Sequence, residues 1–331
     1  MKTSLHLFTI PASADFAQSL ARGLVARSGG GTLEIARARI YLPTRRAARG
    51  FGEAFAKVLG GESLRGGAAL LPQFHALGES DEEEAAFDAV SEGVELKPAI
   101  DPIRRQLLLA ALIRRWDEQA RGGSLNTVQA LHLAASLATV MDEVERQGAD
   151  LNNLQELAPL SLAEHWREVV GFLDLMRTNW PAILQDEGRV NPAAHRNEVM
   201  KLLRERISGQ NQPGMVIAAG STGSIPATAR LLRTIARLDH GAVVLPGLDR
   251  GLDESSWNDL DPGHPQFGMK QLLAEIGATR ADVADWDEQD ARPARTLLLR
   301  ETLRPAPTTD AWRAIADRGP EEIARSLEGM S

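Results

Sequence analysis

At the start of the chain, short apolar runs alternate with segments whose apolar residues recur at helical spacing. The pattern predicts strands at residues 4–10, 35–42 and 68–71, and helices at residues 15–27 and 45–59. Thr44 is a natural N-cap for the second helix, and Pro72 is expected to end the third strand. Strand–helix units joined by short loops are typical of a parallel sheet, so we predict an α/β fold with helices on both faces of the sheet.

The pattern changes over residues 80–209, where long helical segments follow one another without a strand. Helices are predicted at residues 103–119, 125–147, 162–183 and 191–207. Asp101 caps the first of them, with Pro102 at the first helical position. Pro181 is expected to kink or end the third helix near Asn179. We therefore predict an inserted all-helical subdomain.

The strand pattern then resumes. Strands are predicted at residues 215–219 and 241–245, with a helix between them that reaches residue 238. Further helices are predicted at residues 269–276 and 312–327, residues 297–303 fit a helix or a strand, and residues 304–307 have linker composition. Residues 1–79 and 210–305 are thus predicted to form one discontinuous domain around the insertion at 80–209. Residues 306–331 are expected to be a linker or the start of a further domain, in a chain that is a fragment.

Composition narrows the possible functions. The net charge of −8 argues against a protein whose whole surface binds nucleic acid. Arginines nevertheless outnumber acids between residues 16 and 51, which is compatible with a local basic face. The chain has no cysteine, which excludes disulfides and thiol chemistry, and its scattered histidines predict no metal site. The apolar run near the start is too short for a signal peptide or a membrane span, so a cytoplasmic protein without a membrane partner is predicted.

A glycine turn joins the buried strand at residues 215–219 to the next helix. A turn of this kind directs backbone amides outward and favours a bound anion. The alternative is a turn whose glycines serve only backbone freedom, and two glycines are a weak signal. The candidate phosphate or ligand loop consists of Gly220, Ser221, Thr222, Gly223 and Ser224, of which Ser224 can cap the following helix.

An active nucleotide hydrolase would carry a phosphate loop with Gly-Lys-Ser/Thr after its first strand. Here that loop contains Pro11, Ala12, Ser13 and Ala14, with neither glycine nor lysine, and the chain has no Gly-Lys pair. Without the lysine, a triphosphate loses one of its main contacts. Asp249 could be a catalytic carboxylate, although a helix N-cap is favoured. We predict no catalytic residue, no cofactor and no metal ligand in this chain.

A basic segment follows the second predicted strand. It contains Thr44, Arg45, Arg46 and Arg49. A hydroxyl, guanidinium groups and the free amides of a helix start suit the phosphates of a nucleic acid strand. The alternative is a solvent-facing helix start whose arginines pair with nearby acids.

Four segments together resemble a known family: residues 40–49 (IYLPTRRAAR), 218–229 (AAGSTGSIPATA), 243–249 (VVLPGLD) and 264–268 (HPQFG). They resemble the N-terminal region of AddB, of the alphaproteobacterial type. AddB is a subunit of the AddAB helicase–nuclease, which processes DNA double-strand ends for recombinational repair. The resemblance runs in order from residue 5 to about residue 312.

The resemblance implies an inactivated superfamily I helicase-like domain with a P-loop-helicase-like parallel sheet and a degenerate ATP site at Pro11–Ala14. It implies DNA contacts by the Thr44 to Arg49 segment and an AddA-like partner subunit. The nuclease domain and its cysteines lie further downstream in such subunits, so no nuclease activity is implied here. The alternative is an α/β enzyme that binds a nucleotide or phosphate ligand with the Gly220–Ser224 loop. A third hypothesis, in which the helical insertion docks a partner subunit, is compatible with the first.

Overall fold

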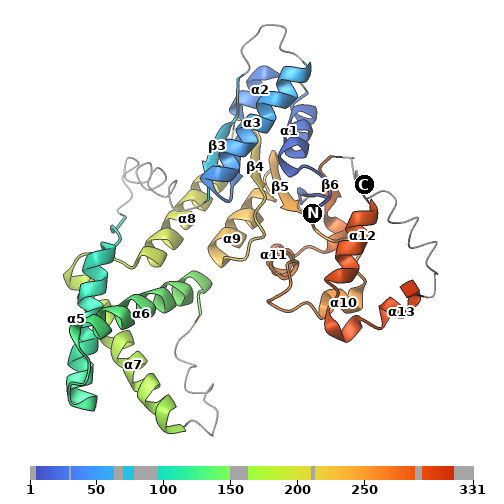
Figure 1. Ribbon diagram of the computed structural model, residues 1–331. Coiled ribbons are helices and arrows are strands. Elements are labelled where there is room, and N and C mark those ends of the chain that lie inside the picture. The colour runs from blue at the N-terminus through green and yellow to red at the C-terminus, as the bar shows by residue number, and fades with distance from the viewer. Residues whose placement is uncertain are drawn as a thin grey trace. The chain divides into compact units, whose positions relative to one another are not determined.

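The computed structural model of this protein contains an α/β unit and an all-helical unit (Figure 1). It describes residues 5–29, 31–62, 70–77, 96–149, 163–209, 213–287 and 293–316. The α/β unit comprises Met1–Glu84, Leu203–Ser224 and Thr228–Ser331, and the helical unit comprises Ala85–Leu202 and Ile225–Ala227. None of the described helices is long and apolar enough to cross a membrane.

The α/β unit is built on six parallel strands in the order β3-β2-β4-β5-β1-β6. The strands are β1 (Leu7–Ile10), β2 (Arg39–Leu42), β3 (Gln73–Ala76), β4 (Val216–Ala219), β5 (Gly241–Pro246) and β6 (Ala284–Asp285). Every residue of β4 is buried, as expected for a parallel strand with both faces covered. The predicted parallel α/β fold is confirmed.

Helices cover both faces of this sheet. The described helices of this unit are α1 (Phe16–Arg27), α2 (Thr32–Arg37), α3 (Arg45–Glu62), α9 (Pro226–Ile235), α10 (Glu254–Asn258), α11 (Phe267–Ile276), α12 (Pro293–Thr302) and α13 (Ala311–Ala316). The connections β1–β2 and β2–β3 move along the sheet in one direction, whereas β4–β5 and β5–β6 move in the other. Right-handed crossovers therefore place α1 and α3 on one face and α9 and α11 on the opposite face.

The second predicted strand begins later than expected. Residues 35–37 belong to α2, and β2 starts only at Arg39. Ile35 and Ala38 are both buried. Residues three apart lie on one face of a helix, and apolar residues at this spacing also occur in a strand that is buried on both faces. The apolar pattern of this short segment was therefore ambiguous.

The third strand follows Pro72 instead of ending there, so the prediction was wrong. Leu70 and Leu71 are about half exposed and belong to no strand, and residues 68 and 69 lie outside the described part. The strand β3 begins at Gln73, whose N–H donates to the carbonyl of Ala38 at 2.9 Å. Because β3 lies at the edge of the sheet, it needs fewer apolar side chains than an interior strand, and a proline is tolerated at its start.

The helical unit contains α5 (Pro102–Arg121), α6 (Thr127–Gln147), α7 (Ala163–Asp186) and most of α8 (Pro192–Gly209). Asp101 caps α5 by accepting hydrogen bonds from the N–H groups of Ile103 and Arg104 at 2.9 and 3.0 Å. The core of the unit lies where α5, α6 and α7 meet, around Leu109 and Trp180.

Of the two expected effects of Pro181, a kink or an end near Asn179, the end is contradicted, because α7 continues through Pro181 to Asp186. Proline removes one backbone hydrogen bond, but the adjacent Trp180 is buried in the core and holds the helix in place. Residues 297–303, which fitted a helix or a strand, fall largely within the helix α12. Of the predicted helix at 312–327, the described part contains α13, which ends at Ala316.

Two helical glycines provide a test of core packing in the α/β unit. A methyl group at Gly23 would overlap the indole ring of Trp286, which is 2% exposed. We expect Gly23→Ala to lower the free energy of unfolding by about 1–3 kcal/mol through overpacking. The matched control is Gly50→Ala on α3, where the added methyl meets no atom within 4 Å. This exposed substitution is expected to raise stability by about 0.5–1 kcal/mol. Urea unfolding of both variants makes the comparison, and equal effects would contradict it.

Candidate functional site at the carboxyl edge of the sheet

The loops that follow four strands pack against one another at the carboxyl edge of the sheet. A Cβ at Gly220, after β4, would lie 3.5 Å from Pro43, after β2. A Cβ at Gly247, after β5, would lie 2.9 Å from Ala12, after β1. Both glycines have a positive φ, 76° and 68°, which disfavours any side chain there. The neighbouring strands β1 and β5 send their connections in opposite directions, and ligands of α/β proteins bind at such a switch point.

The Gly220–Ser224 loop is held by its own backbone and by α11. The N–H of Gly220 donates to the carbonyl of Val244 at 3.0 Å, and that of Gly223 donates to Ser221 Oγ at 3.2 Å. A Cβ at Gly223 would lie 2.7 Å from Leu272 of α11. Since α9 begins at Pro226, Ser224 is not its N-cap, contrary to the prediction. The described hydrogen bonds leave the amides of residues 221, 222 and 224 without a protein acceptor.

The loop after β1 forms a closed turn. The N–H of Ala14 donates to the carbonyl of Pro11 at 3.1 Å, and Asp15 caps α1 by accepting from Gln18 N–H at 3.1 Å. Pro11 and Ala12 face a cavity of about 460 Å³. Thr222 and residues of α12 line the same cavity. The cavity therefore joins the predicted degenerate nucleotide loop to the Gly220–Ser224 loop.

An ion pair spans the polar side of this cavity. Arg300 Nε lies 2.9 and 2.8 Å from the two carboxylate oxygens of Asp249, and Arg300 Nη2 lies 2.8 Å from Oδ1. The two side chains are only 21% and 13% exposed. A Cβ at Gly251 would overlap the guanidinium group, so a side chain there would displace the end of Arg300.

Asp249 does not cap a helix, which corrects the favoured interpretation from sequence. Its Oδ1 accepts hydrogen bonds from the N–H groups of Gly251 and Leu252 at 2.9 and 3.1 Å, within a turn. The N-cap of α10 is Asp253. With two backbone donors and a bidentate arginine already bound, Asp249 has little capacity left to act as a base.

A second arginine, Arg304, follows the end of α12 and is bound in a similar way. Arg304 bonds to Glu301, Ser256 and Asp253, and its side chain is 7% exposed. Of the segment 304–307, which has linker composition, Arg304 and Pro305 are half-buried, whereas Ala306 and Pro307 are exposed. The Ser256 N–H bond and the Arg304 guanidinium hold the pKa of Asp253 at about 2, below its usual 3.8.

Sequence reasoning missed these arginines. Arg300 and Arg304 are four residues apart, and so are their partners Asp249 and Asp253. The matching spacing is visible in the sequence. It indicates paired salt bridges only when the two segments are already known to lie side by side. The resulting pair of ion pairs anchors α12 along the wall of the cavity.

The basic segment lies outside the cavity, at the exposed start of α3. Thr44 Oγ1 accepts a hydrogen bond from the N–H of Ala47 at 3.1 Å, so the predicted N-cap is confirmed. Thr44, Arg45, Arg46 and Arg49 are all exposed. Among the described side chains, no carboxylate pairs with Arg46 or Arg49. Pro43, which precedes this segment, contacts the Gly220 turn, so the arginines border the carboxyl edge.

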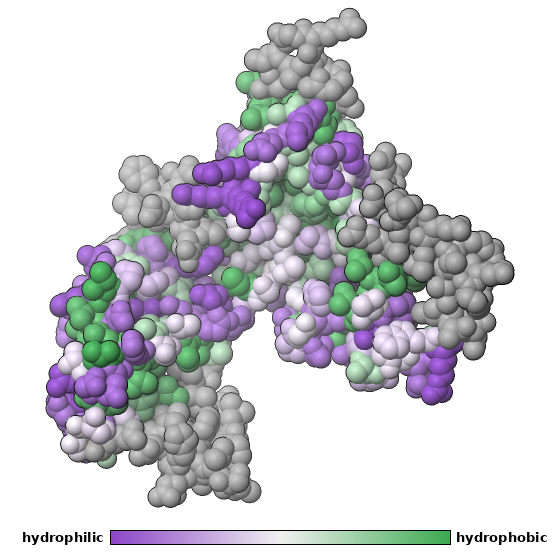
Figure 2. Space-filling view, in the orientation of Figure 1, coloured by the Kyte–Doolittle hydropathy of each residue, from purple (hydrophilic) through white to green (hydrophobic). Residues whose placement is uncertain are grey.

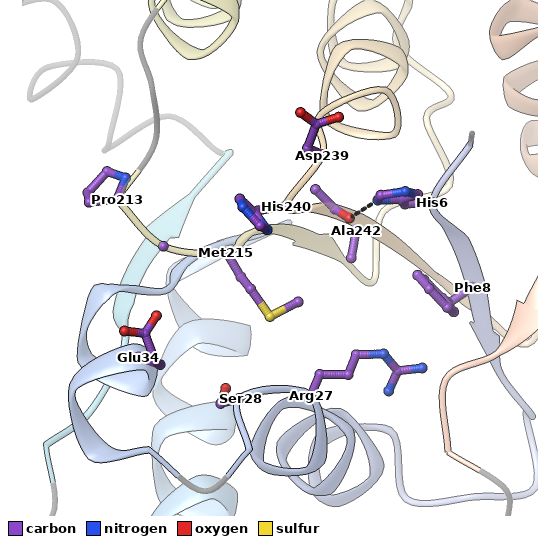
Figure 3. A pocket seen from close by; sticks show the side chains of 12 residues that line it. His6, Phe8, Arg27, Ser28, Glu34, Pro213, Met215, Asp239, His240 and Ala242 are labelled. Atoms are coloured by element: carbon purple, nitrogen blue, oxygen red, sulfur yellow. Dashed lines mark hydrogen bonds between the residues drawn. The ribbon is translucent and has the colours of Figure 1, made fainter. Parts of the chain in front are cut away.

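A second cavity of about 460 Å³ opens at the amino ends of β1, β4 and β5 (Figure 3). His6 Nδ1 lies 3.0 Å from the carbonyl oxygen of Gly241 beside it. Arg27 stacks on the Trp286 ring at 3.9 Å and donates to the Trp286 carbonyl at 2.7 Å, and burial lowers its pKa. Throughout the described ranges, no three His, Asp or Glu side chains gather to hold a metal ion.

The comparisons with known proteins assign no family. No protein-family model matches the chain, and no curated protein matches it.

The Arg300–Asp249 pair can be weighed by a double-mutant cycle with Arg300→Gln and Asp249→Asn. We expect a coupling of about 1.5–3 kcal/mol in the free energy of unfolding, because the pair is bidentate and largely buried. The control cycle uses Arg233 and Glu275, an exposed pair at 3.2 Å, for which about 0.2–1 kcal/mol is expected. Urea unfolding gives both values, and a coupling no larger than the control would contradict a structural role.

Acid stability should depend on Asp253. Its pKa is depressed in the folded state, so its contribution is present above the ordinary value of 3.8 and is lost as the pH falls toward about 2. Asp253→Asn should therefore lower stability near neutral pH and flatten its decline in this window. The matched control is Asp239→Asn, at an exposed carboxylate. Urea midpoints measured down to about pH 2.5 test the expectation; parallel curves for wild type and Asp253→Asn would refute it.

Proposed function

We propose that this chain is a non-catalytic DNA-handling and scaffold region of an AddB-like subunit, in a helicase–nuclease that repairs double-strand breaks in the cytoplasm. The observation that carries the proposal is the exposed start of α3. Arg46 and Arg49 lie on its first turns without a described carboxylate partner. Figure 2 shows strongly hydrophilic side chains gathered where this helix begins.

The physical basis is local electrostatics. The eighteen residues of α3 align their peptide dipoles, which makes the helix start favourable for a phosphate. The arginines add mobile positive charges that can reach a phosphate backbone. Because the whole chain carries a charge of −8, such binding would be confined to this face and would weaken with salt.

We also propose that this chain does not hydrolyse ATP, and the residues that line the carboxyl-edge cavity support this. No lysine lines it, and its best-placed arginine, Arg300, is already paired with Asp249. A triphosphate would have to separate that pair to gain a positive contact. We accordingly propose a degenerate nucleotide site without a cofactor, and an AddA-like partner as the source of motor activity.

A second candidate function is binding of a nucleotide or phosphate ligand by the Gly220–Ser224 loop. It is favoured by the amides of residues 221, 222 and 224, for which no acceptor is described. No lysine or free acid lies beside them among the residues that line the cavity. Saturable binding of ATP below about millimolar in isothermal titration would favour this candidate over the first.

DNA binding is tested with a fluorescent duplex that carries a single-stranded tail, titrated at several salt concentrations. We expect Arg46→Ala/Arg49→Ala to weaken binding and to lower the salt slope by about one unit for each lost phosphate contact. Alanine is a good helix former, so α3 should stay folded.

Two controls accompany this titration. Arg46→Lys/Arg49→Lys keeps the charges and should keep most of the salt slope. Arg233→Ala removes an exposed arginine that is already paired and should change nothing. Failure of the wild-type chain to bind at low salt, or equal loss with Arg233→Ala, would count against the proposal.

A further inference from the structure

A polar cluster is buried where the helices of the helical unit meet. We call it the helix-junction cluster; it consists of Arg105, Asp142, Glu145, Trp180 and Asn191. Arg105 Nη1 donates to Asp142 Oδ2 at 2.8 Å. Trp180 Nε1 donates to Asn191 Oδ1 at 2.9 Å, and Asn191 Nδ2 donates to Glu145 Oε1 at 2.8 Å. Through these bonds the cluster connects α5, α6 and α7 with the start of α8.

Two carboxylate oxygens of this cluster lack a partner. Asp142 Oδ1 and Glu145 Oε2 are both fully enclosed, and neither accepts a hydrogen bond from a described residue. An enclosed carboxylate oxygen without a donor is costly, and native structures rarely leave one unexplained. The two residues are three positions apart on α6, so their side chains project from neighbouring positions on the helix surface.

The charges in the cluster do not balance if both acids are ionised. Arg105 is the one cation, and its side chain is 5% exposed. Asp142, whose side chain is 24% exposed, already binds it directly, so an ionised Glu145 would leave one net negative charge on a pair of acids that each carry an enclosed, unpartnered oxygen. Separating a charge from water without a partner is strongly unfavourable, and the usual outcome is neutralisation of the group.

We propose that a proton lies between Glu145 Oε2 and Asp142 Oδ1, held by Glu145 and donated in a hydrogen bond to Asp142. The proton sits on Glu145 Oε2 and is shared with Asp142 Oδ1, which satisfies both unpartnered oxygens with one hydrogen bond. Glu145 Oε1 continues to accept from Asn191, and Asp142 Oδ2 continues to accept from Arg105. The helix-junction cluster then carries no net charge.

The surroundings of Glu145 support this assignment. Burial is the largest influence and raises the pKa of Glu145; the bond from Asn191, the charge of Arg105 and the backbone bond from Ala194 lower it, and the charge of Asp142 raises it. The charged groups that act on it are Arg105 from α5 and Asp142 from α6. From α8, the Ala194 N–H donates to Glu145 and the Asn197 amide donates to the Glu145 backbone carbonyl at 3.0 Å, while Trp180 of α7 is linked to Glu145 through Asn191.

Loss of the proton would make the junction a pH-sensitive element. Ionised Glu145 would face ionised Asp142 across one helical turn, with a single cation between them. Release of the proton to solvent is therefore expected to loosen the packing of α6 against α8 and the bond network that holds the Trp180 indole. The helical unit would be tightest on the acidic side of the transition.

The test compares the full chain with Glu145→Gln, whose amide can donate to Asp142 as the protonated acid does. Because the folded state holds more protons than the unfolded state in this window, wild-type stability should fall as pH rises. Relative to Glu145→Gln, the folding equilibrium constant should fall by up to about tenfold for each pH unit, until the folded-state pKa is passed. Glu143→Gln is the control, since Glu143 lies on the same helix and is 53% exposed.

A carbon-13 NMR titration of the wild-type side-chain carboxyls gives a readout that does not depend on a variant's folding. We expect one glutamate to titrate above the ordinary range and to move downward in Asp142→Asn. Titration of Glu145 in the ordinary range, or the same pH dependence of unfolding in wild type and Glu145→Gln, would overturn the proposal. Unfolding curves that shift with a chelator would overturn it too, because a bound cation would then be holding the two oxygens.

Discussion

The burial of a parallel sheet on both faces is the constraint on which the α/β unit depends. Its strands must present apolar side chains on either side, and β4 and β5 accordingly contain almost no polar residue. Polar chemistry is thereby excluded from the faces and confined to the two edges where strands meet loops. The two described cavities of this unit lie at those edges, one at the carboxyl ends and one at the amino ends.

At the carboxyl edge, the cavity is lined by the ion pair of Arg300 with Asp249. Arg300 and Arg304 bind Asp249 and Asp253, so two segments of the unit are joined by charged hydrogen bonds beside the cavity. This arrangement keeps the architecture of a ligand edge while engaging the groups that would contact an anion. The exposed arginines of α3 follow β2 at the same edge of the sheet, and β4 and β5 lie between β2 and the strand that precedes the proposed degenerate nucleotide site.

The helical unit differs from the α/β unit in that polar groups are enclosed within it. Its core is apolar around Leu109 and Trp180, yet a cluster of charged and amide groups is enclosed at the junction of its helices. Such a cluster is stable only when its hydrogen bonds are complete and its charges balance. Arg105 supplies one positive charge for two carboxyl groups, which makes the protonation of Glu145 a structural property of the junction. The Nε of Arg105 also lacks a described acceptor, and the shared proton does not account for it.

The sequence by itself determined the strands and helices whose periodicity is long or whose caps are specific. The parallel α/β fold, the Thr44 cap of α3 and the Asp101 cap of α5 were all predicted, because these features depend on neighbouring residues. Short apolar segments were predicted less well: residues 35–37 fit a helix and a strand equally, and the run at 70–71 remains about half exposed. The bond between Arg300 and Asp249 and the enclosure of Glu145 were decided only by the tertiary structure. Each brings together groups from separate elements, and the pairing and burial of a charge are set by the distances between those elements in space.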